Sequence, residues 1–250
     1  MWRPSVSVVI PMFNEEENIA HAIALAGRAL ETHAVDHEII VVDDSSTDRS
    51  PEIVRALAER DPRVHWLRRD GERGLGGSLR AGFAAASKEL VLYMDADLPF
   101  DPHDIGRALR AMELTRADMI AAYRLDRTSE GLRRVIYSYV YNLLIGLLFG
   151  WPHRDVNFSF KLMRRDVLEA VELRSKGSLI SAELLVKARN LGFRIQQIGL
   201  DYFPRSRGGS TLSSPGVVVT ILKELVALGG DMRRPRRRTP PAVDPTVAPS

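Results

Sequence analysis

The chain has no cysteine among its 250 residues. It can therefore form no disulfide bond, no thiolate nucleophile and no cysteine-ligated metal site. This absence agrees with a reducing compartment such as the cytoplasm. A secretory signal pattern is also lacking, because the short apolar run of residues 5–10 is soon followed by acidic residues. We expect that run to form the first strand of the fold.

A strong excess of one charge is lacking too, since the formal net charge is only +3. The positive charge is unevenly distributed, because five arginines crowd into one short stretch near the C-terminus: Arg233, Arg234, Arg236, Arg237 and Arg238. Such a run is most often a solvated tail, and contacts with anionic lipid headgroups or with nucleic acid are the alternatives. The length suffices for one large domain or two small ones.

Short apolar or β-branched runs alternate with helical patterns in the first hundred residues. We expect strands at 5–10, 37–42, 63–67 and 89–94. We expect three helices: one at about 15–31, one that follows the cap-forming residues 45–48, and one at 79–87. This alternation predicts an α/β fold with a mostly parallel central sheet and helices on both faces. Further along, 157–168 predicts a strand and turn before a helix, 181–190 a helix ended by Gly192, and 193–200 a strand.

Each of the first four predicted strands runs into a polar cluster or a Pro/Gly cluster. Ligands bind beyond the carboxyl ends of the strands in such sheets, so we expect a site there. The strongest motif is Asp95-Ala96-Asp97, because two carboxylates one residue apart can reach one hard divalent cation, Mg²⁺ or Mn²⁺, which in turn can hold a diphosphate. The alternative is a pair of solvated turn aspartates.

Two further motifs follow the second and third predicted strands. Asp43-Asp44 can accept hydrogen bonds from a base or a ribose, although one of the two can instead cap the next helix. The glycines of 74–77 resemble part of a dinucleotide fingerprint. That fingerprint must follow the first strand, and these glycines follow the third. A tight loop under the nucleotide sugar is therefore the better interpretation, and a dehydrogenase is disfavoured.

Residues 135–151 carry no charge and are flanked by charged residues. The stretch is borderline for a membrane span, which needs about 20 residues. A buried core helix and a membrane-interface amphipathic helix are the two main interpretations. A second amphipathic helix is expected just before the arginine run. We predict a catalytic domain at 1–212 that includes an interface helix at about 133–151, a C-terminal amphipathic helix at 213–231, and a basic, then Pro-rich, disordered tail at 232–250.

The ordered set of motifs resembles glycosyltransferase family 2, specifically the dolichol-phosphate or polyprenyl-phosphate sugar synthases. The matching stretches span about residues 5–211 and read VVIPMFNEEENI, IIVVDDSSTD, GLGGSLRAGF, VLYMDADLPFDP, AAYR, RRVIYS, DVNFSFKLMRRDVLE and FPRSRGGST. The resemblance implies a nucleotide-diphospho-sugar transferase fold of the type A class, with a mixed central sheet.

The resemblance also implies a donor site. The base and ribose would lie against Pro11, Phe13, Glu15, Val42 and Asp44, and the diphosphate and metal against Asp95, Ala96 and Asp97. Phe13 stands where the family usually has tyrosine, so ring packing is kept and a phenol hydrogen bond is lost. Pro99 stands where similar members often carry a glutamine ligand to the metal, and Asp101 is a candidate substitute.

The implied acceptor site is a set of arginines for a lipid monophosphate. It consists of Arg124, Arg134, Ser138 and Arg205, with Asp97, Arg124 and Arg205 as the catalytic set. Arg134 and Ser138 are four residues apart, on one face of a helix. Thr211 replaces a lysine that the family usually has. A phosphate monoester is already an anion near neutral pH, so its attack needs no general base, whereas a sugar hydroxyl would need one.

The function we expect is therefore inverting transfer of a hexosyl group, with mannose from GDP-mannose favoured, to a polyprenyl or dolichyl phosphate. UDP-glucose or a UDP-N-acetylhexosamine is the alternative donor. A sugar hydroxyl is the alternative acceptor, with Asp155 as the one tempting base. A non-enzymatic protein that binds anionic lipid or nucleic acid is a distant alternative that leaves the strand-end carboxylates unexplained. No nucleic acid partner is expected. The lipid acceptor predicts peripheral binding at the anionic, cytoplasmic face of a membrane.

Overall fold

A computed structural model describes residues 2–126, 132–150, 154–203 and 215–233. The strands are β1 Ser5–Met12, β2 Asp36–Asp43, β3 Val64–Arg68, β4 Leu90–Tyr93, β5 Met119–Arg124, β6 Lys161–Arg164 and β7 Ile195–Leu200. The helices are α1 Ile19–His33, α2 Ser50–Ala58, α3 Leu75–Ala85, the 3₁₀ helix η1 Pro102–Asp104, α4 Ile105–Thr115, α5 Leu132–Phe149, α6 Arg165–Ala170, α7 Ile180–Asn190 and α8 Pro215–Arg233.

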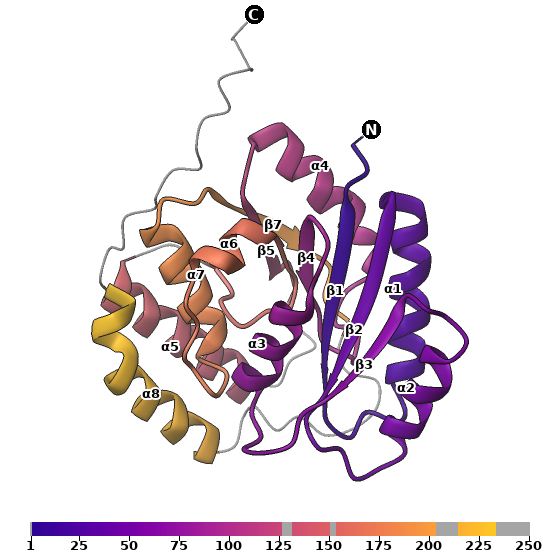
Figure 1. Ribbon diagram of the computed structural model, residues 1–250. Coiled ribbons are helices and arrows are strands. Elements are labelled where there is room, and N and C mark those ends of the chain that lie inside the picture. The colour runs from indigo at the N-terminus through magenta and orange to yellow at the C-terminus, as the bar shows by residue number, and fades with distance from the viewer. Residues whose placement is uncertain (1, 127–131, 151–153, 204–214, 234–250) are drawn as a thin grey trace, which may run out of the picture.

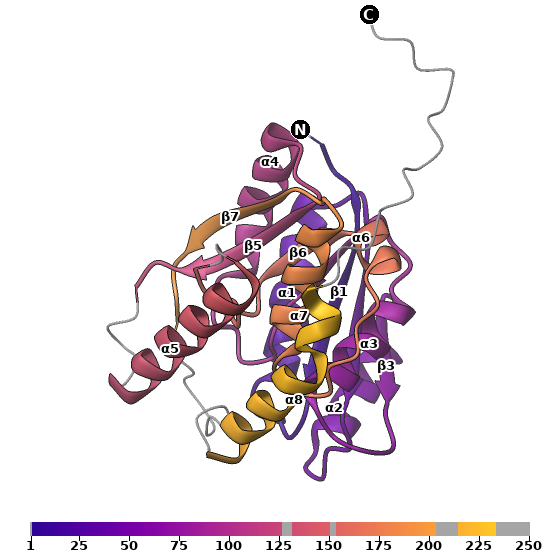
Figure 2. The ribbon, with the colours of Figure 1, turned by 90° about the vertical axis from the view of Figure 1, so that its left-hand side faces the viewer.

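The seven strands form one sheet in the order β3-β2-β1-β4-β6-β5-β7 (Figures 1 and 2). β6 runs antiparallel to both of its neighbours, and the other described pairs are parallel. One face packs against α1, α2 and α4, and the other packs against α3, α5, α6, α7 and α8. The predicted α/β architecture with a mostly parallel sheet and helices on both faces is confirmed.

Burial on both faces explains why the strands carry continuous apolar runs. In β2, Ile39 and Val41 belong to the core under α1, whereas Ile40 and Val42 belong to the core under α3. Successive side chains of a strand point to opposite faces, so a strand covered twice has no polar face. The predicted strands at 5–10, 37–42, 63–67 and 89–94 coincide with β1 to β4 within two residues at each end.

Two local predictions differ from the structure. The helix expected at 79–87 begins earlier, at Leu75, inside the glycine run that we interpreted as a loop. The helix expected from residue 15 begins at Ile19, whose N–H donates to the carbonyl of Glu15 (2.9 Å). The end of α7 is as predicted, because Gly192 follows it with φ +86°, a conformation that favours glycine.

The uncharged segment forms α5, which is half-covered. Ile145 and Phe149 are buried in the core, while other apolar side chains of the helix are exposed. Within the described ranges, no helix combines the length and apolarity that crossing a bilayer would require. α8 begins at Pro215 and ends at Arg233, and the rest of the predicted tail lies outside the described residues. The division into domain, amphipathic helix and tail stays a prediction.

Candidate functional site

The carboxyl ends of β1, β2 and β4 meet at one edge of the sheet. Met12 of β1 is in register with Asp43 of β2, and β4 pairs with β1 on its other side. The chain leaves β1 to form β2 on one side and later returns to form β4 on the other, so β1 marks a topological switch point. Open α/β sheets bind ligands in the crevice outside such a point. The segments 13–15, 43–46 and 95–97 surround it.

The loops after β1 and β2 are joined by hydrogen bonds between side chains and backbone. The N–H of Asn14 donates to Ser46 Oγ (3.0 Å), and the N–H of Thr47 donates back to Asn14 Oδ1 (2.8 Å). The N–H of Glu15 donates to Ser50 Oγ (2.8 Å). Asn14 and Ser45 have φ values of +54° and +64°, which these contacts offset. The two loops therefore form one fixed wall of the site.

Phe13 projects from this wall. Its side chain is exposed, and the guanidinium of Arg73 lies 4.4 Å from the centre of its ring. The pair is a cation–π contact beside the loop that follows β1. Of the other donor residues implied by resemblance, Val42 and Ala96 are buried, while Pro11 and Glu15 are partly buried.

The two aspartates after β2 have different partners. Asp43 is fully buried and accepts from the N–H of Ser46 (2.9 Å), so it stabilises the turn that leads to α2. Asp44 accepts from the guanidinium of Arg69 and from the N–H of Gly74 (2.7 Å). Asp44 therefore holds the glycine turn through Oδ2 and the guanidinium of Arg69 through Oδ1. Its predicted contact with ribose or base stays a prediction.

Asp95 and Asp97 follow β4 directly. Tyr93 is buried, and its hydroxyl donates to Asp95 Oδ1 (2.9 Å). Burial raises the pKa of Asp95 to about 6, and the negative charge of Asp97 is the second cause of the shift. A buried carboxylate whose pKa is raised by a neighbouring carboxylate favours a cation between the two.

The donor set at Asp95 and Asp97 fits a hard divalent cation, because carboxylate oxygens are the ligands that Mg²⁺ and Mn²⁺ prefer. In the part of the chain that the structure describes, no three His, Cys, Asp or Glu side chains are grouped to hold a metal. Asp101, our candidate substitute for a third ligand, caps η1 by accepting from the N–H of His103 (2.9 Å).

Lys161 of β6 is a buried cation that sequence reasoning missed. Its Nζ donates to the carbonyl of Phe158 and lies 5.6 Å from the centre of the Tyr93 ring. Burial lowers the pKa of Lys161 to about 8, against the opposing effects of Asp155 and Asp95. The sequence around Lys161 does not indicate a buried cation, because the lysine simply precedes the apolar residues of β6. Only the pairing of β6 with β4, which sets Lys161 opposite Tyr93, brings it near Asp95.

Arg124 and Asp155 form a buried fork. Arg124 Nε and Nη2 donate to the two carboxylate oxygens of Asp155 at 2.7 and 2.8 Å, and the side chains are 8% and 1% exposed. The ring of Tyr202 lies 5.2 Å from the guanidinium. Asp155 was our one candidate for a general base, and the fork holds both of its oxygens. The predicted contact between Arg124 and an acceptor phosphate stays a prediction.

The rest of the predicted acceptor set is only partly described. Ser138 lies on α5, where the amide of Asn142 donates to its carbonyl (2.7 Å). Asn142 Oδ1 accepts from the N–H of Val156 (2.9 Å), which ties α5 to the segment that carries Asp155. Arg134 belongs to α5, but its side chain is outside the described part, and Arg205 lies outside the described residues altogether. The structure therefore does not test whether these arginines converge.

The chain matches known proteins over most of its length. A family model described as glycosyl transferase family 2 matches residues 7–172. A glycosyltransferase AglD from Haloferax volcanii is 29% identical over 236 residues, which are 92% of this chain and 36% of that protein. A dolichol-phosphate mannosyltransferase from Pyrococcus furiosus is 30% identical over 213 residues, which are 83% of this chain and 59% of that protein. The chain thus spans about a third and about three fifths of these two relatives.

Solved structures share the fold. A glucosyl-3-phosphoglycerate synthase from Mycobacterium tuberculosis, in complex with Mn²⁺, uridine diphosphate and phosphoglyceric acid, superposes with a TM-score of 0.71 at 21% identity, over 91% of this chain and 79% of that one. The same enzyme in complex with Mn²⁺ and UDP-glucose gives a TM-score of 0.67 at 23% identity, over 88% and 78%. At these identities the likeness shows the fold, and it agrees with the architecture predicted from the sequence.

Proposed function

Because the chain belongs to glycosyltransferase family 2, we propose that it transfers a hexosyl group from a nucleotide diphosphate sugar to a polyprenyl or dolichyl monophosphate, with inversion at the anomeric carbon. The observation that carries the proposal is the placement of Asp95 and Asp97 after β4 and of Asp44 after β2, on either side of the switch point at β1. This arrangement offers one wall for a nucleoside and one for a diphosphate.

In this proposal the residues act mainly by binding and orientation. Phe13 and the joined loops after β1 and β2 hold the nucleoside, and Asp95 with Asp97 would hold a Mg²⁺ or Mn²⁺ ion. Such an ion supplies stabilisation of the negative charge on the departing diphosphate. Tyr93 keeps Asp95 in place through its hydroxyl.

The ion pair between Asp155 and Arg124 supports a phosphate acceptor over a hydroxyl acceptor. A hydroxyl needs a positioned base, and the fork to Arg124 engages both oxygens of the one candidate. A phosphate monoester, with a second pKa of about 6, attacks without one. Arg134, Ser138 and Arg205 would bind it, and their charges would offset its repulsion from the diphosphate. The name of the Pyrococcus relative supports the same acceptor class.

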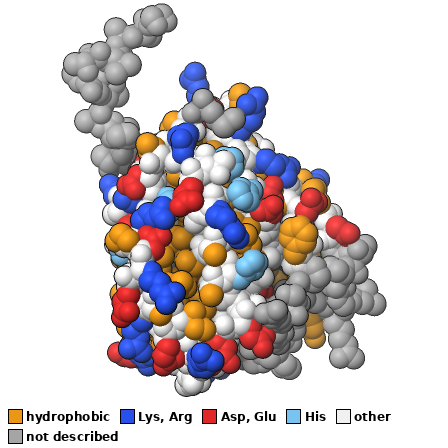
Figure 3. Space-filling view, turned by 90° about the vertical axis from the view of Figure 1, so that its right-hand side faces the viewer, with side chains coloured by type: hydrophobic (Ala, Val, Ile, Leu, Met, Phe, Trp, Pro, Cys, Tyr) orange, Lys and Arg blue, Asp and Glu red, His pale blue; other side chains and the backbone are white. Residues whose placement is uncertain are grey.

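An exposed apolar stripe on α5 supports binding at a membrane surface. Ile136, Val140, Leu143 and Leu147 recur at helical spacing and are 48–75% exposed. α8 lies on the same side of the molecule (Figure 2). It exposes Val226. The side that carries α1, α2 and α4 instead shows interspersed acidic and basic side chains (Figure 3). We place the protein peripherally on the cytoplasmic face of the membrane, with α5 and the basic C-terminus against anionic lipid.

Transfer assays test the chemistry. Purified protein is incubated with Mn²⁺ and, separately, GDP-mannose, UDP-glucose or UDP-N-acetylglucosamine, with a polyprenyl phosphate or the matching polyprenol as acceptor. We expect a glycosylated product with the polyprenyl phosphate and none with the polyprenol. GDP-mannose is the donor that we expect to support transfer. UDP-glucose is the second candidate because a fold neighbour binds it. Transfer to the polyprenol or to free sugars, with none to the phosphate, would reject the acceptor assignment.

Liposome flotation tests the membrane surface. We expect the protein to float with anionic vesicles at low salt, to bind less at high salt, and to lose affinity when truncated after Asp231. Leu147→Glu should also weaken binding, because it places a charge in the apolar stripe. Val35→Glu, an equally exposed apolar residue away from α5, is the matched control. Equal loss in both variants, or no flotation at low salt, would contradict the model.

A further inference from the structure

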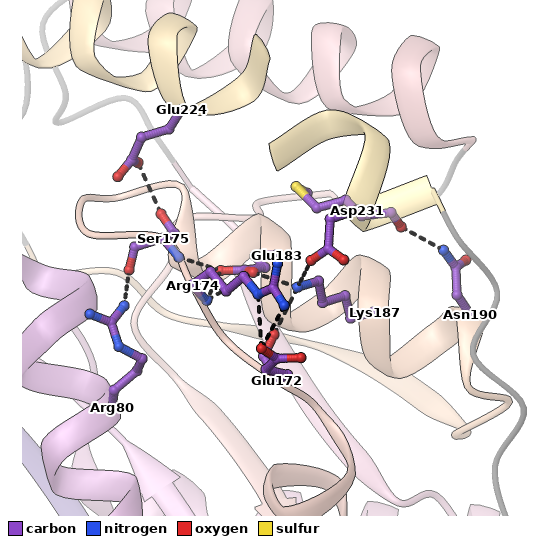
Figure 4. Close-up of polar contacts among 10 residues, drawn as sticks. Arg80, Glu172, Arg174, Ser175, Glu183, Lys187, Asn190, Glu224 and Asp231 are labelled. Atoms are coloured by element: carbon purple, nitrogen blue, oxygen red, sulfur yellow. Dashed lines mark hydrogen bonds and ion pairs between the residues drawn. The ribbon is translucent and has the colours of Figure 1, made fainter. Parts of the chain in front are cut away.

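The loop between α6 and α7 closes around one carboxylate of α8. The hydroxyl of Ser175 donates to Glu224 Oε2 (2.9 Å) (Figure 4). The N–H groups of Lys176 and Gly177 donate to Oε1 (2.7 and 2.9 Å). Hydrogen bonds to an ionised acceptor are about twice as strong as neutral ones. Glu224 therefore fixes the backbone at Lys176 and Gly177 through Oε1 and the side chain of Ser175 through Oε2.

The same loop contacts the glycine turn, residues 74–77, at the start of α3. The carbonyl of Lys176 accepts from the N–H of Gly76 (2.9 Å), and the carbonyl of Ser175 accepts from Arg80 (Figure 4). A β-carbon at Gly74 or Gly76 would collide with these two carbonyl groups. The glycines are thus explained by a close approach of two backbones.

The glycine turn in turn reaches the nucleotide wall of the candidate site. The N–H of Gly74 donates to Asp44 Oδ2 (2.7 Å), and Arg69 joins the other oxygen of Asp44 to the hydroxyl of Ser78 in α3. An unbroken series of contacts therefore leads from Glu224 through the loop and the glycine turn to Asp44. It links the helix nearest the basic C-terminus to the pocket proposed for the donor.

α8 has a second set of anchors that does not touch the glycine turn. Asp231 pairs with Lys187 of α7 (2.6 Å), and the amide of Asn190 donates to the carbonyl of Met232 (2.9 Å) (Figure 4). Lys187 also pairs with Glu183 (2.7 Å), which accepts from the N–H of Ser175 (2.8 Å). Asp231 holds the same helix through an ion pair with Lys187 of α7, whereas Glu224 bonds directly to residues 175–177.

We propose that Glu224 is a positioning residue for the donor nucleotide. By holding residues 175–177 against Gly74 and Gly76, it sets the position of Asp44, so the affinity for a nucleoside diphosphate depends on how α8 is seated. The identity of the ligand class rests on the proposed function. The effect of Glu224 on the order of the glycine turn does not depend on the ligand and can be measured without one.

Four variants of the full-length protein separate positioning from general stability. Glu224→Ala removes all three hydrogen bonds. Glu224→Gln keeps an oxygen for the two N–H groups and can still meet Ser175. Asp231→Ala, the matched control, removes the other acidic anchor of α8. Ser175→Ala removes one of the three bonds and provides a milder test should Glu224→Ala fail to fold.

Nucleotide affinity is measured by calorimetry with GDP and with UDP, each with Mn²⁺. We expect Glu224→Ala to weaken binding by about tenfold, within the range of typical couplings between sites, and Ser175→Ala to weaken it less. Glu224→Gln should stay within about threefold of the wild type. Asp231→Ala should lower thermal stability and keep the affinity. In transfer assays, Glu224→Ala should raise the KM for the donor and leave that for the lipid acceptor unchanged. Equal losses of affinity in Glu224→Ala and Asp231→Ala would overturn the proposal.

Hydrogen exchange gives the measurement that is independent of ligand. Glu224→Ala should speed exchange in peptides that cover residues 74–78, because Gly76 loses a fixed acceptor, and Asp231→Ala should not. Unchanged exchange in Glu224→Ala would overturn the positioning role. If the wild type binds neither nucleotide but Glu224→Ala still speeds hydrogen exchange at residues 74–78, the proposed function fails. The structural coupling between Glu224 and the glycine turn would then still hold.

Discussion

The donor side and the acceptor side of the candidate site are built in different ways. On the donor side, short polar side chains bond to backbone groups of a neighbouring loop, as Asn14 and Ser46 do. On the acceptor side, a buried ion pair joins β5 to a segment 31 residues away, and a helix exposes an apolar stripe. The first arrangement fits the small polar donor that we propose, and the second fits the proposed acceptor, which is half lipid.

Loss of Asp97 should have the largest effect on the donor side. We expect Asp97→Ala to lower transfer by about 10²–10³-fold or more, because a group that stabilises developing charge in the transition state is lost. Nucleotide binding should lose its dependence on Mn²⁺. Steady-state kinetics with and without EDTA measure this. Asp104→Ala, which removes an ion pair with the exposed Arg107, is the control. Wild-type turnover in Asp97→Ala would reject the metal role.

The buried fork should make the acceptor side sensitive in stability. Asp155→Asn leaves the Arg124 guanidinium buried without its counter-charge, and breaking such a pair costs about 3–5 kcal/mol. Urea unfolding monitored by circular dichroism measures the change. The double variant Arg124→Met/Asp155→Leu should recover much of the loss, since it removes both charges. A loss below about 1 kcal/mol, the scale of surface pairs, would show that the pair is solvated.

The arginines assigned to the acceptor should separate the two sides kinetically. Arg134→Ala and Arg205→Ala each remove a charged hydrogen-bond donor to phosphate, which contributes about 1.5–3 kcal/mol. We expect a correspondingly higher KM for the lipid phosphate and an unchanged affinity for the donor nucleotide. Arg60→Ala, a surface arginine on the donor half, serves as the control. A fall in donor affinity with constant acceptor kinetics would reverse the assignment.

The smallest effect concerns the surface ion pair between Arg63 and Asp61, near the start of β3. The Arg63 side chain bonds to Asp61 and lowers the pKa of that carboxyl to about 2. An unfolded aspartate has a pKa of about 4, so the unfolded chain binds the proton more readily. The stabilisation is therefore complete above about pH 4 and is lost as the pH falls towards 2.

Asp61→Asn should thus cost up to about 1 kcal/mol at pH 7, because both side chains are partly exposed. The two proteins should become equally stable near pH 2. Thermal unfolding across this pH range measures the difference, and Asp70→Asn, whose side chain is 86% exposed, is the control. A difference that persists unchanged at pH 2 would show that the effect is not electrostatic.

The same contrast explains what the sequence could predict. The strands β1, β2 and β4 and the acids that follow them are contiguous in the chain, and apolar runs ended by polar residues revealed them. The direction of β6 was not readable from its residues, because a run covered on both faces has the same pattern whether it is parallel or antiparallel. The family resemblance had implied a mixed sheet without identifying the strand.

Pairs between distant segments were the other limit. Nothing near Arg124 or Asp155 in the chain announces their fork, and Lys161 reaches Asp95 only through strand pairing. The glycines of 74–77 were correctly separated from a dinucleotide motif. The reason for Gly74 and Gly76, the approach of residues 175–176, lies a hundred residues away in the chain. Local patterns predict elements and their ends, whereas buried charge pairs depend on tertiary packing.

β6 lies between β4 and β5, so the sheet is completed late in synthesis. β4 can pair with β1 soon after both have left the ribosome, but its other edge stays open until residues 161–164 have been made. An open edge of an apolar strand invites pairing with another chain. A nascent chain is therefore most prone to aggregate while residues 94–160 are being translated. A pause in translation after residues 161–164 have left the ribosome, rather than before, would favour folding.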